Sequence, residues 1–358
     1  MKNLKNYIKD YIFESVWDIE NNVESNNEEF ILNDIKKFIK DNYENINITR
    51  CKIVFDDKKD KYVVNYDLQV FLKPDSEQLT NGMFEWGTVG GFFNCESCPK
   101  LTSLEGAPEA VKDNFYCARC PKLTSLKGAP KIVSGAFSCS RCPITSLEGA
   151  PEKVDGNFYC LACPELKTLE GAPKEVGKDF LCTICPELTS LKGAPQVVRG
   201  TFDCAECPIV SLGGAPKEVG KSFSCAKCVK LETLKGAPET VGRDFYCNGC
   251  PITTLEGAPT IVKDYFNCSE CPNLTSLKGA PRKVGKSFDC HECPKLTSLE
   301  GAPEEVGMSF DCSHCKKLVT LKGAPKEVGW IFNCEKCPKL KSLDGVPKVG
   351  FRVNSDIK

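Results

Sequence analysis

The sequence predicts a mainly β solenoid, in which short coils of chain stack around one continuous core. Three observations lead to this fold class. Cys-x-x-Cys pairs account for 24 of the 25 cysteines, and successive pairs begin 21 or 22 residues apart. Each pair lies in the same unit, F-x-C-x-x-C-P-x-L-T-S-L-x-G-A-P-x-x-V. A fixed period of this length is typical of repeat architectures. The pairs begin at Cys95, Cys117, Cys139, Cys160, Cys182, Cys204, Cys225, Cys247, Cys268, Cys290, Cys312 and Cys334.

Within one unit, the apolar residues are spaced as on a short β-strand. Phe115 and Cys117 are two residues apart and therefore point to the same side, which we take as the interior. Leu123 and Leu126 face the same core after the chain has turned. Gly128 allows a backbone turn that a side chain would hinder. We therefore expect a parallel β-sheet built from the Phe-x-Cys segments.

The rest of the unit returns the chain to the next strand. Ala129 is small enough for a crowded inner wall, Pro130 prevents a helix there, and Val133 leads back to the next coil. No stretch of the unit has the period or length of a helix, so turns and extended chain should form the outer side. One coil cannot bury its apolar face alone, whereas stacked coils share a continuous core.

The repeat resembles the leucine-rich repeat, L-x-x-L-x-L-x-x-N/C-x-L. F-x-C-x-x-C matches L-x-L-x-x-N/C, and three units have the shorter continuation C-x-I, at Cys142–Ile144, Cys207–Ile209 and Cys250–Ile252. The resemblance implies a right-handed leucine-rich-repeat-like solenoid of about 12 coils, of 21–22 residues each, with a parallel β-sheet and little helix. Three residues separate Val133 from Phe137 where the family has two, which leaves the local bulge and the curvature open.

The repeat frame also extends to both ends of the array. Leu79, Val89 and Phe93 match repeat positions, so a degenerate first coil precedes the first cysteine pair. Phe351 and Val353 replace the Phe-x-Cys motif near the C-terminus, which predicts a terminal strand without thiols. We therefore assign residues 79–353 to the solenoid and residues 354–358 to a C-terminal tail.

Residues 1–78 are expected to form a small α+β domain that caps the solenoid. Asn26 or Asn27 can cap a helix there, and two strand-like runs, Arg50–Phe55 and Tyr62–Leu72, flank a turn. This hairpin should cover the open end of the array, which otherwise presents unpaired backbone groups. Apolar residues recur at helical spacing in residues 1–22, at Leu4, Ile8, Tyr11, Ile12 and Val16. The second predicted helix carries Ile31, Ile35, Phe38 and Ile39 at the same spacing.

The whole chain resembles repeat proteins of tailed bacteriophages, which join a short helical head to arrays of F-x-C-S-x-N-x-L-T-S-L-x-G-A-P coils. The opening M-K-x-L-x-x-Y-I is also similar to the capsid-targeting leader of some internal head proteins of phages. An amphipathic helix without a targeting role is the alternative, and we favour it because such helices are common. The resemblance implies a phage-encoded protein in the host bacterial cytoplasm or packaged in the virion.

The cysteine pairs admit a structural and a metal-binding interpretation. Two thiolates on a tight turn supply half of a tetrahedral zinc site. However, the first residues are charged and do not resemble a secretory signal, so we expect a reducing compartment in which thiols stay free. Twelve evenly spaced pairs within a repeat frame favour buried packing, with the second thiol donating to backbone carbonyls. Cys51 stands outside the repeat, and we expect it in the core. We predict no cofactor.

A partner should bind at the variable positions of the strand face, between Phe and Cys and between the two cysteines. Tyrosine and arginine are common interface anchors. The predicted partner-binding residues are Tyr116, Arg119, Arg141, Tyr159, Leu161, Leu181, Ile184 and Tyr246. A secondary polar patch consists of Asp289, His291, Glu292, Asp311 and His314, for which a metal site is the less favoured alternative.

The position after the second Leu of each unit nearly alternates in charge, for example at Glu105, Lys127, Glu170 and Lys192. Neighbouring coils then present opposite charges to one another. A coil that slipped in register would place like charges together. We therefore expect ion pairs between coils that favour the correct register rather than large stability.

The sequence favours a non-enzymatic protein-binding scaffold. The 47 Lys and Arg residues balance 48 Asp and Glu residues, so nothing indicates a nucleic-acid binder. No apolar run is long enough for a membrane span. No nucleophile–base set is apparent, and we expect no catalytic domain after the repeats. The alternatives are a metal-sequestering or redox-active cysteine array and a passive structural virion protein.

Overall fold

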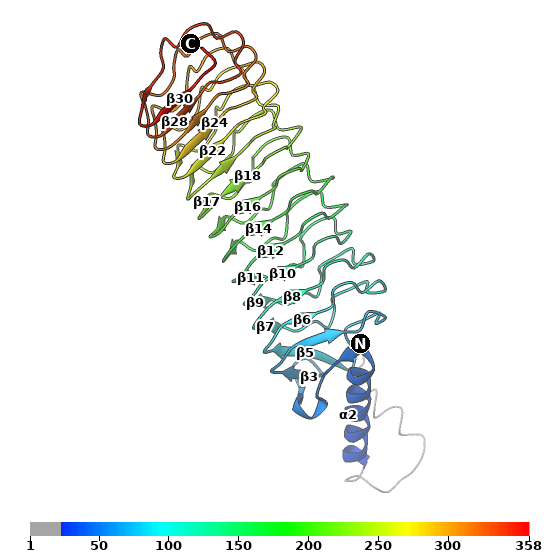
Figure 1. Ribbon diagram of the computed structural model, residues 1–358. Coiled ribbons are helices and arrows are strands. Elements are labelled where there is room, and N and C mark those ends of the chain that lie inside the picture. The colour runs from blue at the N-terminus through cyan, green and yellow to red at the C-terminus, as the bar shows by residue number, and fades with distance from the viewer. Residues whose placement is uncertain (1–22, 358) are drawn as a thin grey trace. The chain divides into compact units, whose positions relative to one another are not determined.

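The computed structural model describes residues 23–357 (Figure 1). It divides into two compact units. Unit 1 contains the described residues up to Cys142, together with Glu148–Val154. Unit 2 contains Pro143–Leu147 and the described residues from Asp155 onward. Each unit is a parallel-sheet solenoid with little helix, which confirms the predicted fold class.

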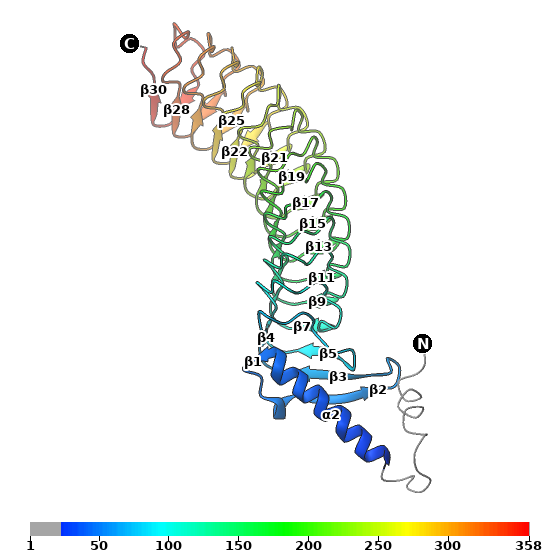
Figure 2. The ribbon, with the colours of Figure 1, turned by 90° about the vertical axis from the view of Figure 1, so that its right-hand side faces the viewer.

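Each regular coil contributes one strand to each of two sheets (Figure 2). The Phe sheet contains the predicted Phe-x-Cys strands. In unit 1 these are β6 (Phe93–Asn94), β8 (Phe115–Tyr116) and β10 (Phe137–Ser138). In unit 2 they are β12 (Phe158–Tyr159), β14 (Phe180–Leu181), β16 (Phe202–Asp203), β18 (Phe223–Ser224), β20 (Phe245–Tyr246), β22 (Tyr265–Asn267), β24 (Ser287–Asp289), β26 (Phe310–Asp311), β28 (Ile331–Asn333) and β30 (Arg352–Asn354).

The second sheet, which we call the Val sheet, was not expected from the sequence. It forms where the valine of each repeat unit returns the chain to the next Phe strand. In unit 1 its strands are β5 (Phe84–Val89), β7 (Ala110–Val111), β9 (Ile132–Val133) and β11 (Lys153–Val154). In unit 2 they are β13 (Glu175–Val176), β15 (Val197–Val198), β17 (Glu218–Val219), β19 (Thr240–Val241), β21 (Ile261–Val262), β23 (Lys283–Val284), β25 (Glu305–Val306), β27 (Glu327–Val328) and β29 (Lys348–Val349).

Strict register places identical residues above one another in the core. Phe180 pairs with Phe202, and Phe202 with Phe223. In unit 2, successive Phe rings stack with centroids 5.0–5.5 Å apart and ring planes 5–25° apart. Leu188 and Leu191 of one coil are fully buried, as predicted for the two leucines of the repeat. Each coil therefore fills the same internal space in the same way.

The Gly-Ala-Pro turn differs in part from the expectation. Gly128 has a φ of +90°, and a Cβ there would lie 2.5 Å from the backbone nitrogen of Glu105, so the turn requires glycine. Ala129, however, is only half-buried, and its amide donates to Leu126 O at 2.9 Å. The buried residue of the inner wall is Pro130. The predicted placement of Ala129 was wrong because the tight turn directs it partly outward.

The alternating charges form ion pairs between neighbouring coils, as predicted. The Nζ–Oε distances range from 2.7 to 3.4 Å, and the side chains are exposed. Exposed pairs of this kind add little stability, so their role in register remains the better explanation. The pairs are Glu105–Lys127 in unit 1 and Glu170–Lys192, Glu256–Lys278 and Glu300–Lys322 in unit 2.

Unit 1 begins with a helix and a hairpin. Their bounds are α2 (Val23–Asn42), β1 (Tyr43–Glu44), the 3-10 helix η1 (Ile48–Arg50), β2 (Lys52–Asp56), β3 (Lys61–Tyr66) and β4 (Val70–Leu72). The helix expected from Leu4 to Val16 lies outside the described residues. Asn26 and Asn27 lie within α2, so neither caps it. Ile35 and Ile39 of α2 are fully buried.

The run Tyr62–Leu72 is not one strand, because it contributes to both sheets. β3 pairs antiparallel with β2, which confirms the hairpin, and parallel with β5 of the Val sheet. β4 pairs with β1 and with β6 of the Phe sheet. The hairpin therefore continues the Val sheet beyond β5. β3 and β4 both precede residue 79. The domain boundary at residue 79 stays a prediction. Cys51 is half-buried rather than in the core.

The terminal strand without thiols exists, but its register differs from the prediction. In β30, Val353 rather than Phe351 pairs with Phe332 of β28. Phe351 lies outside the core and is 69% exposed. The sequence motif F-x-V was aligned two residues too early, because Val353 fills the Phe position and Phe351 falls on the preceding bend.

Candidate functional site: the outward face of the Phe sheet

The thiols of the Cys-x-x-Cys pairs point into the solenoid, where all 24 are buried and outside disulfides. The first thiol of a pair reaches the following coil: Cys225 Sγ donates to Tyr246 O at 3.4 Å. The second thiol reaches the preceding coil: Cys250 Sγ donates to Cys225 O at 3.1 Å. Thiols are weak donors, but each pair thereby connects its coil to both neighbours. This confirms the predicted donation to backbone carbonyls.

Burial favours the neutral form of several of these thiols. It raises the pKa of Cys290 and of Cys312, and it raises the pKa of Cys337 in the last pair to about 11. Nucleophilic attack and metal ligation both need the thiolate. Among the residues that the structure describes, no group of three or more His, Cys, Asp or Glu side chains is arranged to hold a metal ion.

The residue before the second cysteine has a left-handed backbone in every Cys-x-x-Cys turn described, with φ between 51° and 72°. This turn directs the side chain away from the core. Ile184 is 54% exposed at this position, and Arg119, Arg141 and Glu292 are also exposed. The residues are Ser97, Arg119, Arg141, Ala162, Ile184, Glu206, Lys227, Gly249, Glu270, Glu292, His314 and Lys336.

The position between Phe and Cys often has a structural role that the sequence did not reveal. Where it is Asn or Asp, the side-chain oxygen accepts a hydrogen bond from the amide two residues later, which is an Asx turn. The distances are 2.8–3.2 Å. The residues are Asn94, Asp203, Asn267, Asp289, Asp311 and Asn333. Tyrosine and leucine at this position cannot form such a turn.

Four predicted partner-binding residues lie together in unit 2, and we call them the apolar cluster: Tyr159, Leu161, Leu181 and Ile184. Tyr159 of β12 and Leu181 of β14 are directly opposite in the parallel register. Both are half-buried, as is Leu161, while Ile184 is exposed. Parallel neighbours on one face of a sheet are in reach of one another. Tyr159 and Leu181 are therefore apolar neighbours on the outward face, and Leu161 and Ile184 lie in the Cys-x-x-Cys turns that follow their two strands.

The other predicted partner-binding residues are not members of the apolar cluster. Tyr116, Arg119 and Arg141 belong to unit 1, where Tyr116 is half-buried and Arg119 forms an ion pair with Glu96 at 3.5 Å. Tyr246 belongs to unit 2 but lies on β20, with β16 and β18 between it and β14. It is associated instead with the polar patch.

The polar patch lies on β24, β26 and the Cys-x-x-Cys turns that follow them, and Tyr265 of β22 contacts it. Tyr265 donates its hydroxyl to Asp289 Oδ2 at 2.7 Å, and His291 Nδ1 lies 2.7 Å from Asp289 Oδ1. The rings of Tyr246 and Tyr265 are 5.8 Å apart. Burial lowers the pKa of His291, but the hydrogen bond and charge of Asp289 outweigh it, so the pKa is raised overall.

The remaining members of the polar patch are less closely engaged. His314 Nδ1 lies 3.9 Å from Glu292 Oε1, and both side chains are exposed. Asp311 Oδ2 accepts a hydrogen bond from the side-chain amide of Asn333 at 3.0 Å. The arrangement therefore stabilises charges on the surface but provides no convergent set of ligands or catalytic groups.

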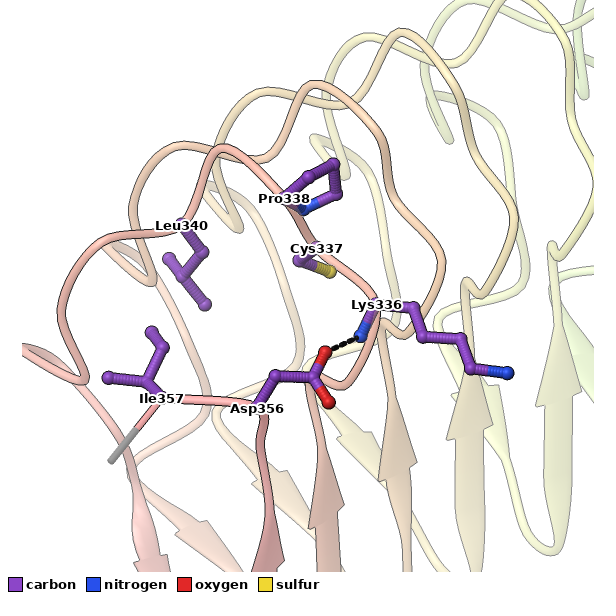
Figure 3. A pocket seen from close by; sticks show the side chains of 6 residues that line it. All are labelled: Lys336, Cys337, Pro338, Leu340, Asp356 and Ile357. Carbon is purple, nitrogen blue, oxygen red and sulfur yellow. Dashed lines mark hydrogen bonds between the residues drawn. The ribbon is translucent and has the colours of Figure 1, made fainter.

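Two surface cavities of unit 2 lie away from these residues. One, of about 410 Å³, is lined by Lys336, Cys337, Pro338, Leu340, Asp356 and Ile357 (Figure 3). There the Asp356 carboxylate accepts a hydrogen bond from the Lys336 amide. The other, of about 540 Å³, lies on the Val sheet near Ile261, and its charged residues pair with one another, for example Lys283 with Glu305 at 2.8 Å.

Two features of the surface were missed by sequence reasoning. Tyr265, which donates to Asp289, is the first residue of β22, directly after the bend, and only its departure from the repeat consensus was a signal. Met308, Trp330 and Phe351 occupy the middle position of that bend in three successive coils, and all three are exposed. Reading that position down the array would have found them.

No family model matches the chain, and no curated protein matches it. Within the described residues, no helix has both the length and the apolar character needed to cross a membrane. The functional argument therefore rests on the surface chemistry described above.

Proposed function

We propose that this protein is a non-enzymatic scaffold that binds a partner protein through the outward face of its Phe sheet. The observation that carries the proposal is the apolar cluster, in which Tyr159 pairs with Leu181 and Ile184, in the turn that follows Leu181, is 54% exposed. Contiguous exposed apolar surface usually marks an interaction site.

The repeat itself does not require apolar residues at these positions. The next two coils have Asp203 and Ser224 at the position of Leu181. The first of them has Glu206 at the position of Ile184. Since those coils stack in the same register, the apolar side chains contribute little to the fold. A rigid solenoid presents such a surface without an ordering cost on binding.

We further propose a phage-encoded protein, similar to the leucine-rich-repeat-like proteins of tailed phages, that acts in the host bacterial cytoplasm or in the virion. The twelve-fold F-x-C-x-x-C unit and the L-T-S-L-x-G-A-P arm support this proposal. The stacked, thiol-filled coils are compatible with a reducing compartment, because the fold places free thiols in its core.

The test is crosslinking in the native host with a photoreactive residue at position 184. We expect a discrete crosslinked protein that is lost when Tyr159→Asp and Leu181→Asp are combined, with the circular dichroism spectrum unchanged. The matched control carries the crosslinker at position 261, where Ile261 is 52% exposed on the Val sheet of the same unit. Equal crosslinking from both positions, or none, contradicts the proposal, and none would favour a passive structural role.

A further inference from the structure

An exposed apolar column runs along one corner of unit 2, at the bend between the Val and Phe strands. Met308, Trp330 and Phe351 are 38%, 46% and 69% exposed. Their backbones are bonded in sequence, since Trp330 N donates to Met308 O at 2.8 Å and Phe351 N to Trp330 O at 2.9 Å. The rings of Trp330 and Phe351 are 6.2 Å apart. We call these three residues the corner column.

The corner column is not needed by the repeat. The equivalent residues of the preceding coils in unit 2 are charged, or in one case glycine: Lys178, Gly200, Lys221, Arg243, Asp264 and Lys286. The backbone beneath the column is closely packed, because a Cβ at Gly307 or Gly329 would lie 2.0–2.1 Å from the carbonyl oxygen of the preceding coil. The three side chains are exposed on this backbone, and they form an apolar surface of the kind that binds partners.

The adjacent face of the Phe sheet is acidic. Asp289 of β24 and Asp311 of β26 are directly opposite in register, and like charges opposite one another are unfavourable. Among the described residues, neither carboxylate forms an ion pair with a lysine or arginine; their partners are Tyr265, His291 and the Asn333 amide.

The basic residues next to the corner column do not offset this acidity. Lys286 precedes the column, but its Nζ is 2.9 Å from Asp264, so it is already paired. Arg352 follows Phe351 and is exposed. It would repel a cation at the end of the column. A cationic group of a bound partner is therefore placed more favourably near Asp289 of β24 and Asp311 of β26 than near Arg352 of β30.

We propose that the corner column is a second docking surface, which binds a basic amphipathic segment of a partner protein. The apolar side of that segment packs on Trp330 and Phe351, and its lysine or arginine side chains lie over Asp289 and Asp311. A second copy of this chain fits less well, because a two-fold contact brings the acidic pairs of both copies together. An anionic lipid surface is repelled by the same carboxylates. The surface is separate from the apolar cluster, so the inference goes beyond the proposed function.

The test uses a synthetic amphipathic Leu/Lys peptide and the full chain carrying Trp17→Phe. Trp330 is then the one exposed tryptophan, since Trp86 is buried. We expect the peptide to shield Trp330 from acrylamide quenching, and an amphipathic Leu/Glu peptide to leave it unshielded. By calorimetry, Trp330→Ser with Phe351→Ser should weaken peptide binding by about tenfold or more.

Charge variants test the orientation of the segment. Asp289→Asn with Asp311→Asn keeps the Asx-turn acceptors and should weaken binding about three- to tenfold at low salt. Arg352→Ser should strengthen it about twofold. Val319→Ser, which removes a side chain 52% exposed on another side of the same coils, should leave binding unchanged. Tyr159→Asp with Leu181→Asp should also leave it unchanged, so the two proposals can fail separately.

Four results would overturn the inference. Equal affinity for the Leu/Glu peptide would remove the charge argument, and unchanged affinity in the Trp330→Ser, Phe351→Ser variant would remove the apolar one. Shielding of Trp330 by phosphatidylglycerol vesicles but not by the Leu/Lys peptide would assign the column to lipid. Self-association that Trp330→Ser abolishes, measured by sedimentation, would assign it to a second copy.

Discussion

The first coil of unit 1 and the regular coils of unit 2 fill their cores in different ways. In the first coil, the Trp86 indole donates to the Tyr43 hydroxyl at 2.9 Å, and that hydroxyl donates to Leu79 O at 2.6 Å. The Tyr43 and Trp86 rings meet edge-on at 5.2 Å and 79°. In unit 2, by contrast, near-parallel Phe rings repeat from coil to coil, as for Phe223 and Phe245 at 5.5 Å and 8°.

This difference indicates how the two regions are specified. The first coil uses unlike side chains with directional hydrogen bonds, so each member has one place in which it fits. The regular coils use like side chains, so each contact has equivalents above and below it. A substitution should therefore be most costly in the first coil, and less costly where neighbouring coils can share the change.

The largest effect is expected for Trp86→Ala. Trp86 is 1% exposed, and its removal leaves a cavity and takes away the hydrogen bond that the Tyr43 hydroxyl accepts. We expect the free energy of unfolding to fall by about 3–5 kcal/mol, measured by urea denaturation with far-UV circular dichroism. Trp330→Ala is the matched control, because Trp330 is 46% exposed and its loss should cost no more than about 0.5 kcal/mol. Equal losses for the two variants would contradict the comparison.

A smaller effect is expected for Phe245→Leu in the regular stack. Phe245 is fully buried between Phe223 and Phe266, with centroids 5.5 and 5.3 Å away. Leucine keeps most of the apolar volume but loses the two ring contacts, so we expect a loss of about 1–2 kcal/mol. Amide hydrogen exchange should show the change mainly in the coils next to β20. A loss of protection throughout unit 2 would show that its coils are more strongly coupled than their packing indicates.

The regular array was predictable from the sequence because its residues recur. Phe115, Cys117, Leu123 and Leu126 occupy their predicted inward positions, since only one arrangement can satisfy the same spacing many times. The Val sheet was missed because two-residue strands such as β9 have no alternating pattern to detect. The β3–β4 break was missed because a continuous apolar run does not reveal where a chain changes sheets.

The surface was less predictable than the core. The positions of Tyr159, Leu181 and Ile184 followed from the repeat frame, and the structure places Tyr159 opposite Leu181 and leaves Ile184 exposed. The Asx turns at Asp289 and Asp311 depend on backbone geometry that no spacing encodes. The corner column escaped notice because it lies in the bend, outside the Phe-x-Cys-x-x-Cys motif, where sequence variation looks like loop variation.

The thiols should contribute less than the aromatic rings. Cys293 Sγ donates to Cys268 O at 3.3 Å, and Cys293→Ala removes this weak bond and one buried atom, at a cost of about 1 kcal/mol. A thiol reagent applied to the native protein should modify half-buried Cys51 before the 24 buried thiols. Rapid reaction of most thiols, or several equivalents of zinc in protein purified without chelators, would contradict the structural role and support a metal-binding array.

The smallest effect concerns pH and the polar patch of unit 2. The pKa of His291 is raised in the folded state, because the hydrogen bond and charge of Asp289 outweigh the opposing effect of burial. The folded protein therefore binds this proton more tightly than the unfolded chain, whose histidine pKa is about 6.5. The resulting stability is fully present below about pH 6.5 and is lost as the pH rises through the folded value. Urea midpoints should thus fall slightly from pH 6 to pH 8, a range in which carboxylates with ordinary pKa values do not titrate.

Asp289→Asn keeps the Asx-turn acceptor but removes the charge, so it should flatten this dependence. If the variant keeps the full pH dependence, another group is responsible, and the close contact between His291 and Asp289 has no role in stability.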